Sequence, residues 1–384
     1  MIGTGVWATQ TALRPPAPWQ ATRNLLRRKA GAIASLPGVM SSPPVVSVGA
    51  ADTSAIAGSN ITLVEDEATR LWIGGRFYKY PFAGTNWATW NSVHLNGVDD
   101  DQLGGAVEFV TTAVTFEIVV NAGGKLFQIW VNDQLVQADP FQPGSGVRFY
   151  KVRFAGSATR KIRVAFMNGI SWQGIKLPEG EAIFATAPEA PIRCLVAGDS
   201  FVEGAGAVIG GQSAYGLLGF ANVAALGLGI DDLWSSGSGG TGWVQTNGSR
   251  VNLTGRLASD VIGPAPNVVV IAMGMNDADA AAAGTNAAAA LTSIRAALPG
   301  ALIYVVGPWD PWAPDPMPSS AMAVRAAVSA ASSGRAGVWF FDPSGLPFSR
   351  ASGDITHPSR AGHQTLGVWL ANQIRTELRL AGLS

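Results

Sequence analysis

Charged residues and cysteines are scarce in this chain of 384 residues. Asp, Glu, Lys and Arg make up only 14% of the sequence, and 26 basic residues balance 26 acidic ones. Because there is no basic excess, the composition argues against nucleic acid as a partner and favours a neutral or weakly charged ligand. The single cysteine, Cys194, excludes an internal disulfide framework and a cysteine-based zinc site.

Histidines and long hydrophobic runs are scarce as well. The three histidines, His94, His357 and His363, lack the spacing of metal ligands, so we do not expect a zinc enzyme. Gly, Pro and charged residues interrupt every apolar stretch before it reaches about 18 residues, which argues against a membrane span. The first residues do not resemble an ordinary secretory signal. The sequence leaves the oligomeric state and the location open, including extracellular or particle-associated action.

The N-terminal 45 residues are predicted to form an arm with a short helix over residues 19–33, because three prolines precede a run without helix breakers. The basic residues of this helix are Arg23, Arg27, Arg28 and Lys29. They form either a contact surface for a partner or an ordinary solvated helix face.

Residues 46–188 are rich in short alternating runs of Val, Ile, Phe, Trp and Thr, separated by Gly, Asp and Asn. This texture is typical of antiparallel strands. Strands are predicted at 106–110, 115–120, 126–131 and 161–166, with hairpin turns at 122–124 and 132–133. We therefore expect an antiparallel β-sandwich of jelly-roll character.

Residues 189–384 alternate apolar strands with helical segments, which indicates an α/β domain built on a parallel sheet. The predicted strands are 194–197, 232–236, 267–273, 301–307 and 338–341, and the main predicted helices are 278–298, 321–333 and 359–380. Such sheets bind ligands beyond the carboxyl ends of their strands. The loops after these strands are therefore the place to look for chemistry.

Ser200 follows the first parallel strand in the motif Gly198-Asp199-Ser200, a position that presents a hydroxyl at the edge of the sheet. His357 comes three residues after Asp354, in a loop before the last helix. An Asp and a His with this spacing on a turn bring the carboxylate to Nδ1 of the imidazole, so that Nε2 faces a serine. A nucleophile, a base and an orienting carboxylate are thus all present.

Four short blocks resemble those of the SGNH (GDSL-like) hydrolase family. In chain order they are Gly198-Asp199-Ser200, Ser238-Gly239-Gly240-Thr241, Gly274-Met275-Asn276-Asp277 and Asp354-Ile355-Thr356-His357. The resemblance extends from about residue 191 to the C-terminus. It implies a flavodoxin-like three-layer α/β/α domain that hydrolyses esters without a metal or cofactor.

The resemblance also implies a role for each matching residue. Ser200 is expected to be the nucleophile, His357 its base and Asp354 the residue that orients the imidazole. The N–H groups of Ser200 and Gly239 and the amide of Asn276 are expected to form the oxyanion hole. Gly240 is the alternative to Gly239, because several glycines adjoin in this block.

Substrate clues come from a loop over residues 307–316 that contains Trp309 and Trp312. Their rings either contact a sugar or an acyl chain, or pack in the interior. A β-sandwich ahead of an SGNH domain is similar to certain two-domain carbohydrate O-acetylesterases, so the expected substrate is a small ester or an acetylated carbohydrate. The alternatives are a short-chain or lipolytic esterase and a non-catalytic carbohydrate-binding or structural protein of a surface or particle.

Overall fold

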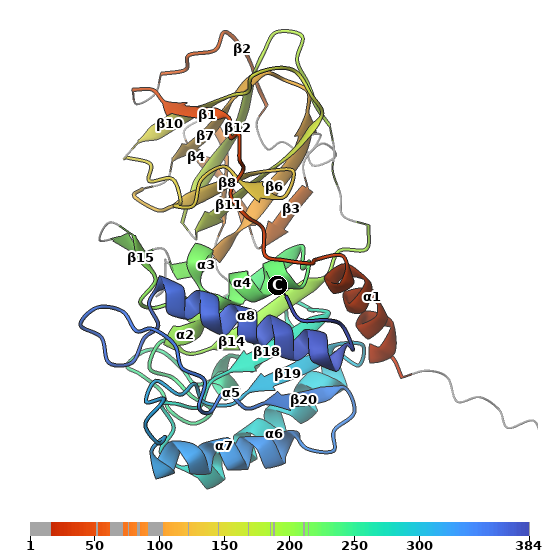
Figure 1. Cartoon of the computed structure of the whole chain (residues 1–384), viewed down its shortest axis with the longest axis vertical. Helices are drawn as coiled ribbons and strands as arrows, with labels where there is room; N and C mark the ends of the chain where they lie inside the picture. Colours follow the sequence, from red (N-terminus) through yellow and green to blue (C-terminus); the bar gives the residue numbers. More distant parts are fainter. Residues whose placement is uncertain are drawn as a thin grey trace, which may run out of the picture.

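The structure is a computed structural model. It describes residues 17–50, 53–61, 72–75, 77–82, 85–90, 103–121, 123–144, 146–167, 169–184, 186, 189–209, 212–213 and 215–383. His94 lies outside these residues. A β-rich part sits above an α/β part in Figure 1.

Two antiparallel sheets form the β-rich part. One has the strand order β1-β10-β7-β12-β5-β4 with β2 beside β12, and the other has the order β13-β6-β11-β8-β9 with β3 beside β6. The strands are β1 Val45–Val48, β2 Gly58–Ile61, β3 Trp72–Gly75, β4 Phe77–Phe82, β5 Thr85–Trp90, β6 Leu103–Thr111, β7 Thr115–Asn121, β8 Phe127–Val131, β9 Gln134–Leu135, β10 Val147–Arg153, β11 Arg160–Met167, β12 Ser171–Pro178 and β13 Ile183–Phe184. The predicted β-sandwich is confirmed, because residues of both sheets, such as Phe109 and Trp172, share one buried core.

The two predicted hairpin turns have different outcomes. Asn132 and Asp133 join β8 to β9 with φ of 47° and 64°, the left-handed backbone that a two-residue hairpin requires. The turn at Gly123 and Gly124 joins β7 to β8, which belong to opposite sheets, so the hairpin predicted there is wrong. The chain also changes sheet from β6 to β7 and from β10 to β11 to β12, as in a jelly roll.

The α/β part is built on a five-stranded parallel sheet of order β17-β14-β18-β19-β20. Its strands are β14 Arg193–Gly198, β17 Asp232–Gly237, β18 Val268–Ala272, β19 Leu302–Val306 and β20 Val338–Phe341. All five lie where the apolar runs predicted them. This order is that of flavodoxin-like folds, so the predicted fold class is confirmed.

Helices cover both faces of the parallel sheet (Figure 1). Alternate residues of β18 point to opposite faces: Val268 and Val270 join a core with α4 and α8, while Val269 and Ile271 join a core with α6 and α7. The helices are α4 Phe220–Gly227, α6 Ala280–Ala297, α7 Ser319–Ser332 and α8 Arg360–Glu377. None of the helices described in the chain combines the length and hydrophobicity needed to cross a bilayer.

The predicted N-terminal helix forms as α1 (Trp19–Gly31) and packs on the α/β part. Leu26 and Ala30 are fully buried in the core that contains α4 and α8. Arg23 pairs with Glu377 and Lys29 pairs with Asp231. Two of the four basic residues thus hold the helix in place, whereas Arg27 and Arg28 remain exposed.

The sandwich rests against one edge of the parallel sheet. Strands β3 and β6 contact β17, and the short helix α3 (Tyr215–Leu218) contacts β6 and β11. The edge strand β17 therefore has β14 as its sheet partner on one side and the sandwich beside it.

A buried guanidinium joins the carboxyl ends of β14 and β17. Arg256, at the end of α5 (Leu253–Arg256), is 2% exposed and donates to the carbonyls of Gly198 and Ser236 at 2.6 and 2.8 Å. Asp260, on the π-helical turn η2 (Leu257–Ile262), lies 3.5 Å from the guanidinium and compensates its charge.

Replacing Arg256 is expected to destabilise the fold strongly. Arg256→Met leaves the Asp260 carboxylate buried without its cation, which typically costs 3 to 5 kcal/mol, so a loss of about that size is expected in urea unfolding. Arg325→Met, which breaks an ion pair with the half-exposed Asp342, is the control and should cost less than about 1 kcal/mol. Equal losses in the two variants would contradict this account.

His363 on α8 is completely buried and both of its ring nitrogens are bonded. Nδ1 accepts from the N–H of Phe220 at 3.3 Å, so Nε2 carries the hydrogen that it donates to the carbonyl of Ala205 at 2.9 Å. Burial lowers the pKa of His363 to about 4. The residue is therefore a neutral structural link between α8, α4 and the loop after α2.

The buried His363 predicts acid sensitivity. Since its pKa is about 4 in the folded state and about 6.5 in the unfolded state, the unfolded chain binds more protons between these values. Stability is expected to fall as pH is lowered from about 7 to 4, by roughly 3 kcal/mol from this residue. Urea unfolding at several pH values should give a flatter pH dependence for His363→Gln than for the wild type, and parallel curves would refute the prediction.

Candidate active site

The predicted nucleophile lies at the carboxyl end of β14, the strand between β17 and β18. Asp199 caps the short helix α2 (Ser200–Glu203) by accepting from the N–H of Phe201 at 3.0 Å, so Ser200 occupies the first helical position. Gly198 is needed before it, because a Cβ there would lie 2.1 Å from the carbonyl oxygen of Ala272 on β18. Ser200 is partly exposed, at the edge where ligands bind in such sheets.

The structure brings Ser200, His357 and Asp354 together although Ser200 and His357 are 157 positions apart. Nε2 of His357 lies 2.9 Å from Oγ of Ser200, and Nδ1 lies 2.7 Å from Oδ2 of Asp354. A carboxylate only accepts, so Nδ1 carries the hydrogen and Nε2 has the lone pair that can take a proton from the serine. This is the geometry of a base-activated nucleophile.

Asp354 is held by its own loop. Its Oδ1 accepts from the N–H groups of Thr356 and His357 at 2.7 and 2.9 Å, while Oδ2 meets the imidazole. Burial alone would raise the pKa of Asp354, but these N–H groups and the imidazole hold it below its usual value. The carboxylate therefore stays ionised beside the imidazole and stabilises its protonated form.

The loop that carries His357 is fixed at both ends. The N–H of Ala351 donates to the carbonyl of His357 at 2.9 Å, and that of Ser359 donates to Ser349 at 2.8 Å. Gly206, at φ +93°, lies so close that a Cβ would be 2.3 Å from the carbonyl oxygen of Pro358 and 3.2 Å from Cβ of His357. The imidazole is thus positioned by backbone contacts on both sides.

Asp199 is a second carboxyl group beside the nucleophile. It is completely buried, and its Oδ2 has no hydrogen-bond partner within the described part of the chain. Burial raises the pKa of Asp199 to about 7, against the bond from Phe201 and the nearby charges of His357 and Arg256. Through its bond from the N–H of Phe201, Asp199 anchors the start of α2 and thereby the position of Ser200.

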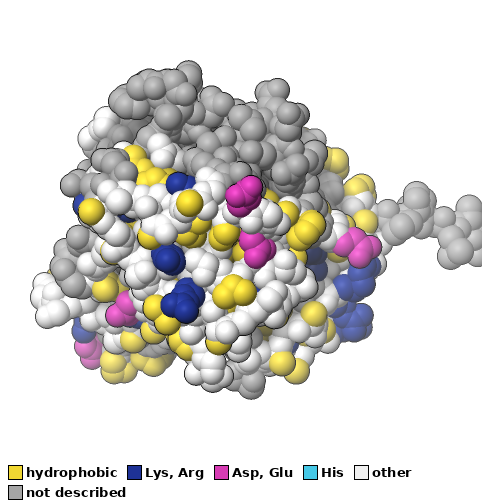
Figure 2. Space-filling model, turned by 90° about the horizontal axis from the view of Figure 1, so that it is seen from above, with side chains coloured by type: hydrophobic (Ala, Val, Ile, Leu, Met, Phe, Trp, Pro, Cys, Tyr) yellow, Lys and Arg dark blue, Asp and Glu magenta, His cyan; other side chains and the backbone are white. Residues whose placement is uncertain are grey.

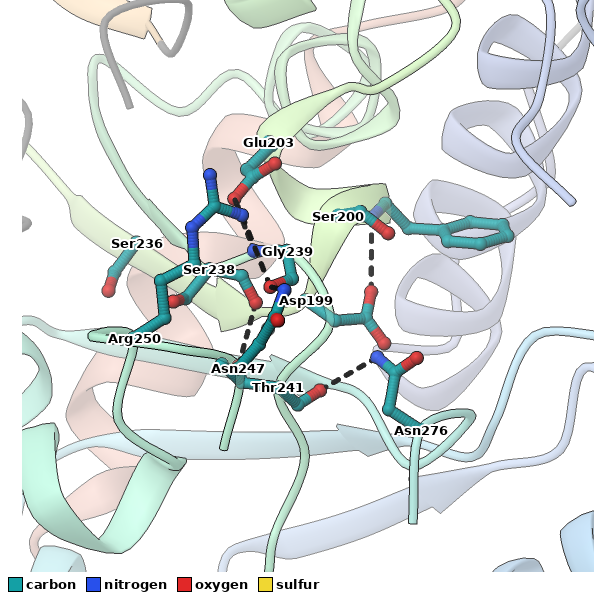
Figure 3. Close-up of polar contacts among 12 residues, drawn as sticks. Asp199, Ser200, Glu203, Ser236, Ser238, Gly239, Thr241, Asn247, Arg250 and Asn276 are labelled. Atoms are coloured by element: carbon teal, nitrogen blue, oxygen red, sulfur yellow. Dashed lines mark hydrogen bonds and ion pairs between the residues drawn. The ribbon is translucent and has the colours of Figure 1, made fainter. Parts of the chain in front are cut away.

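The second and third blocks are bonded to each other. The amide of Asn276 donates to the carbonyl of Thr241 at 2.9 Å, which leaves its second hydrogen for another acceptor (Figure 3). The carboxylate of Asp277 accepts three N–H groups, from Trp243, Val244 and Gln245, at 2.9 to 3.0 Å. These bonds place the Asn276 amide and the second-block loop at fixed positions beside β14.

The predicted donor of the second block is occupied. The N–H of Gly239 donates to the carboxylate of Glu203. Gly239 therefore has no free N–H for the oxyanion role that was predicted for it. The N–H groups of Ser200 and Gly240 have no hydrogen-bond partner among the described residues. The alternative glycine, Gly240, is therefore the one with a free N–H.

Sequence reasoning missed three side chains that contact Gly239: Glu203, Asn247 and Arg250. Glu203 stands three residues after Ser200, where a charged residue in an otherwise apolar segment was the available signal. Asn247 and Arg250 lie in a loop whose sequence carries no motif. Their contact with Gly239 exists only in the folded chain.

The two tryptophans of the loop after β19 differ in exposure. Trp309 is 1% exposed and packs against Phe201 and Phe220 at centroid distances of 6.1 and 5.1 Å. Its predicted contact with substrate is therefore corrected to interior packing. Trp312 is half-buried and keeps part of its ring accessible.

No cluster of three or more His, Cys, Asp or Glu suited to a metal ion occurs within the described ranges. The chemistry that the site supports with its own residues is nucleophilic attack by a serine assisted by a histidine.

Comparison with solved structures shows where this two-part architecture occurs. A family two carbohydrate esterase from Clostridium thermocellum, solved with cellohexaose, is 18% identical, with 80% of this chain and 99% of that chain covered and a TM-score of 0.60. An acetyl xylan esterase from Butyrivibrio proteoclasticus is 14% identical, with coverage of 85% and 99% and a TM-score of 0.59. A salicylyl-acyltransferase from a tetracycline biosynthetic pathway is 14% identical, with coverage of 86% and 100% and a TM-score of 0.65. At these identities the likeness shows a shared fold.

Comparison of the sequence itself gives one family. No curated protein matches the chain. The model of the GDSL-like Lipase/Acylhydrolase family matches residues 196–365, a range that contains all four blocks. The part of the chain that holds Ser200, Asn276 and His357 is therefore similar to the GDSL-like Lipase/Acylhydrolase family.

Proposed function

We propose that this protein is a serine esterase that removes O-acetyl groups from a carbohydrate through an acyl-enzyme. The observation that carries the proposal is the pair of contacts made by His357, 2.9 Å to Ser200 and 2.7 Å to Asp354. Both contacts have the distances and the order of groups that acyl transfer requires.

In the proposed first half-reaction, Oγ of Ser200 attacks the ester carbonyl while Nε2 of His357 takes its proton. The negative oxygen of the tetrahedral intermediate is stabilised by the free N–H of Ser200 and by the amide of Asn276. When the C–O bond breaks, the imidazolium returns the proton to the departing sugar hydroxyl. Asp354 stabilises the imidazolium during this transfer.

In the second half-reaction, a water molecule replaces the sugar. His357 takes a proton from the water as it attacks the acyl-enzyme, and then gives that proton to Oγ of Ser200 as acetate leaves. The balance is one ester and one water consumed for one alcohol and one acid formed. No group beyond these residues is needed in this scheme.

Two observations support a carbohydrate as the alcohol. Structures with this two-part fold include the carbohydrate esterase solved with cellohexaose and the acetyl xylan esterase. Trp312 is only half-buried and lies in the loop that follows β19, and a flat apolar ring suits stacking on a sugar.

Acyl transfer to another alcohol is the second candidate, because the salicylyl-acyltransferase shares the fold along 86% of this chain. The same Ser200, His357 and Asp354 would form the acyl-enzyme, and only the group that resolves it would differ. Adding a sugar acceptor to the assay separates the two: a transferase forms a new ester faster than it releases acetate.

Ser200→Ala is expected to lower kcat for p-nitrophenyl acetate by about 10⁴-fold or more, because the step that forms the acyl-enzyme is lost. Ser320→Ala, which removes an exposed hydroxyl on α7, is the matched control and should keep wild-type turnover. If Ser200→Ala and the wild type do not differ in ester turnover or in biological activity, the protein is a binding or structural component instead.

A substrate panel tests the acyl and alcohol groups. Acetate release from acetylated xylan and glycan oligomers is expected, with p-nitrophenyl ester cleavage declining as the acyl chain lengthens. Fast cleavage of long acyl esters together with near-zero deacetylation of the glycans would favour a lipolytic esterase.

A further inference from the structure

Three side chains surround the peptide groups of Gly239, and we call this set the Gly239 clamp. Glu203 accepts from its N–H, while Arg250 and Asn247 each donate to its carbonyl at 3.1 Å. Nη1 of Arg250 also lies 3.2 Å from the carboxylate of Glu203. In Figure 3 these groups converge on Gly239 from separate segments of the chain.

The clamp is tightly packed. A Cβ on Gly239 would lie 2.4 Å from Nη1 of Arg250 and 2.9 Å from the carboxylate of Glu203, and a Cβ on Gly240 would lie 2.4 Å from Nδ2 of Asn247. Asn247 and Arg250 also exchange backbone hydrogen bonds at 2.9 and 3.0 Å. A side chain at either position would have to displace these groups, and the φ of +72° at Gly240 favours glycine there in addition.

The charges of the clamp keep it closed. Glu203 is 8% exposed, and Arg250 neutralises its carboxylate. Moving the carboxylate away to free the Gly239 N–H would separate a largely buried ion pair, and breaking such a pair is strongly unfavourable. The ion pair therefore opposes release of the Gly239 N–H from Glu203.

The clamp also fixes the direction of the next N–H group. The peptide between Gly239 and Gly240 is trans, so its N–H points opposite to its carbonyl. The carbonyl of Gly239 faces Arg250 and Asn247, and in Figure 3 Arg250 and Ser200 lie on opposite sides of Gly239. The free N–H of Gly240 is consequently directed away from Arg250 and Asn247.

From this geometry we infer that the N–H of Gly240, not that of Gly239, is the second-block oxyanion donor, and that Glu203, Arg250 and Asn247 are its positioning residues. The inference rests on the proposed esterase function. It deepens that function by naming the backbone group that stabilises the intermediate and the ion pair that aims it.

A crystal structure with a boronic acid tests the inference, because a boronate bonded to Oγ of Ser200 mimics the tetrahedral intermediate. One boronate oxygen should lie about 3 Å from the backbone nitrogens of Ser200 and Gly240, with Gly239 still bonded to Glu203. An oxygen bonded to the nitrogen of Gly239, with Glu203 displaced, would overturn the inference alone. Failure of any boronate to bond Ser200, with equal turnover by wild type and Ser200→Ala, would overturn the proposed function as well.

Kinetics of clamp variants give a second test. Glu203→Ala and Arg250→Met are expected to lower kcat by about 10²-fold with little change in KM, since a donor misplaced by about 1 Å costs that much. Boronate affinity should fall in parallel. Glu203→Gln keeps an acceptor for the Gly239 N–H, so it should retain more activity than Glu203→Ala.

Arg193→Met is the matched control, because Arg193 forms an ion pair with Asp232 at the opposite end of β14 and β17. It should leave kcat and boronate affinity unchanged. If folded Glu203→Ala and Arg250→Met also keep wild-type kcat, the clamp does not position a donor.

Discussion

The buried guanidinium of Arg256 is the interaction on which the arrangement of the site depends. It binds the carbonyl of Gly198, two residues before the nucleophile, and that of Ser236, just before the second block. The loops that carry the proposed nucleophile and the proposed oxyanion donors thus leave the sheet from strand ends tied to a common cation. Asp260 lies on a π-helical turn, a rare geometry that often occurs near functional sites, and compensates the charge.

Around that tie, hydrogen bonds between charged side chains and backbone groups hold the site together. Asp277 binds three N–H groups of the second-block loop, and Asp354 binds two of its own loop. Gly239 is bonded at both its N–H and its carbonyl. Loops held in this way keep their remaining free donors in place, and preorganised donors need no rearrangement as charge develops in a transition state.

The sequence predicted the parts that depend on local pattern and missed those that depend on distant contacts. Apolar runs located all five parallel strands, and an Asp three residues before His357 indicated their contact. The turn at Gly123 and Gly124 was misread because turn residues do not specify which sheet the next strand joins. Loop position placed Trp309 near the site, but only packing against Phe201 decides where its ring points. The occupied N–H of Gly239 depends on a carboxylate 36 residues away.

The position of the sandwich beside β17 has a consequence for solubility. An edge strand offers unpaired N–H and carbonyl groups to which the strands of other chains can add. Because β3 and β6 lie against β17, the β-sandwich shields this edge of the parallel sheet. Beyond any role in ligand recognition, the sandwich thus acts as a barrier against strand addition, and an excised hydrolase part would aggregate through the uncovered edge.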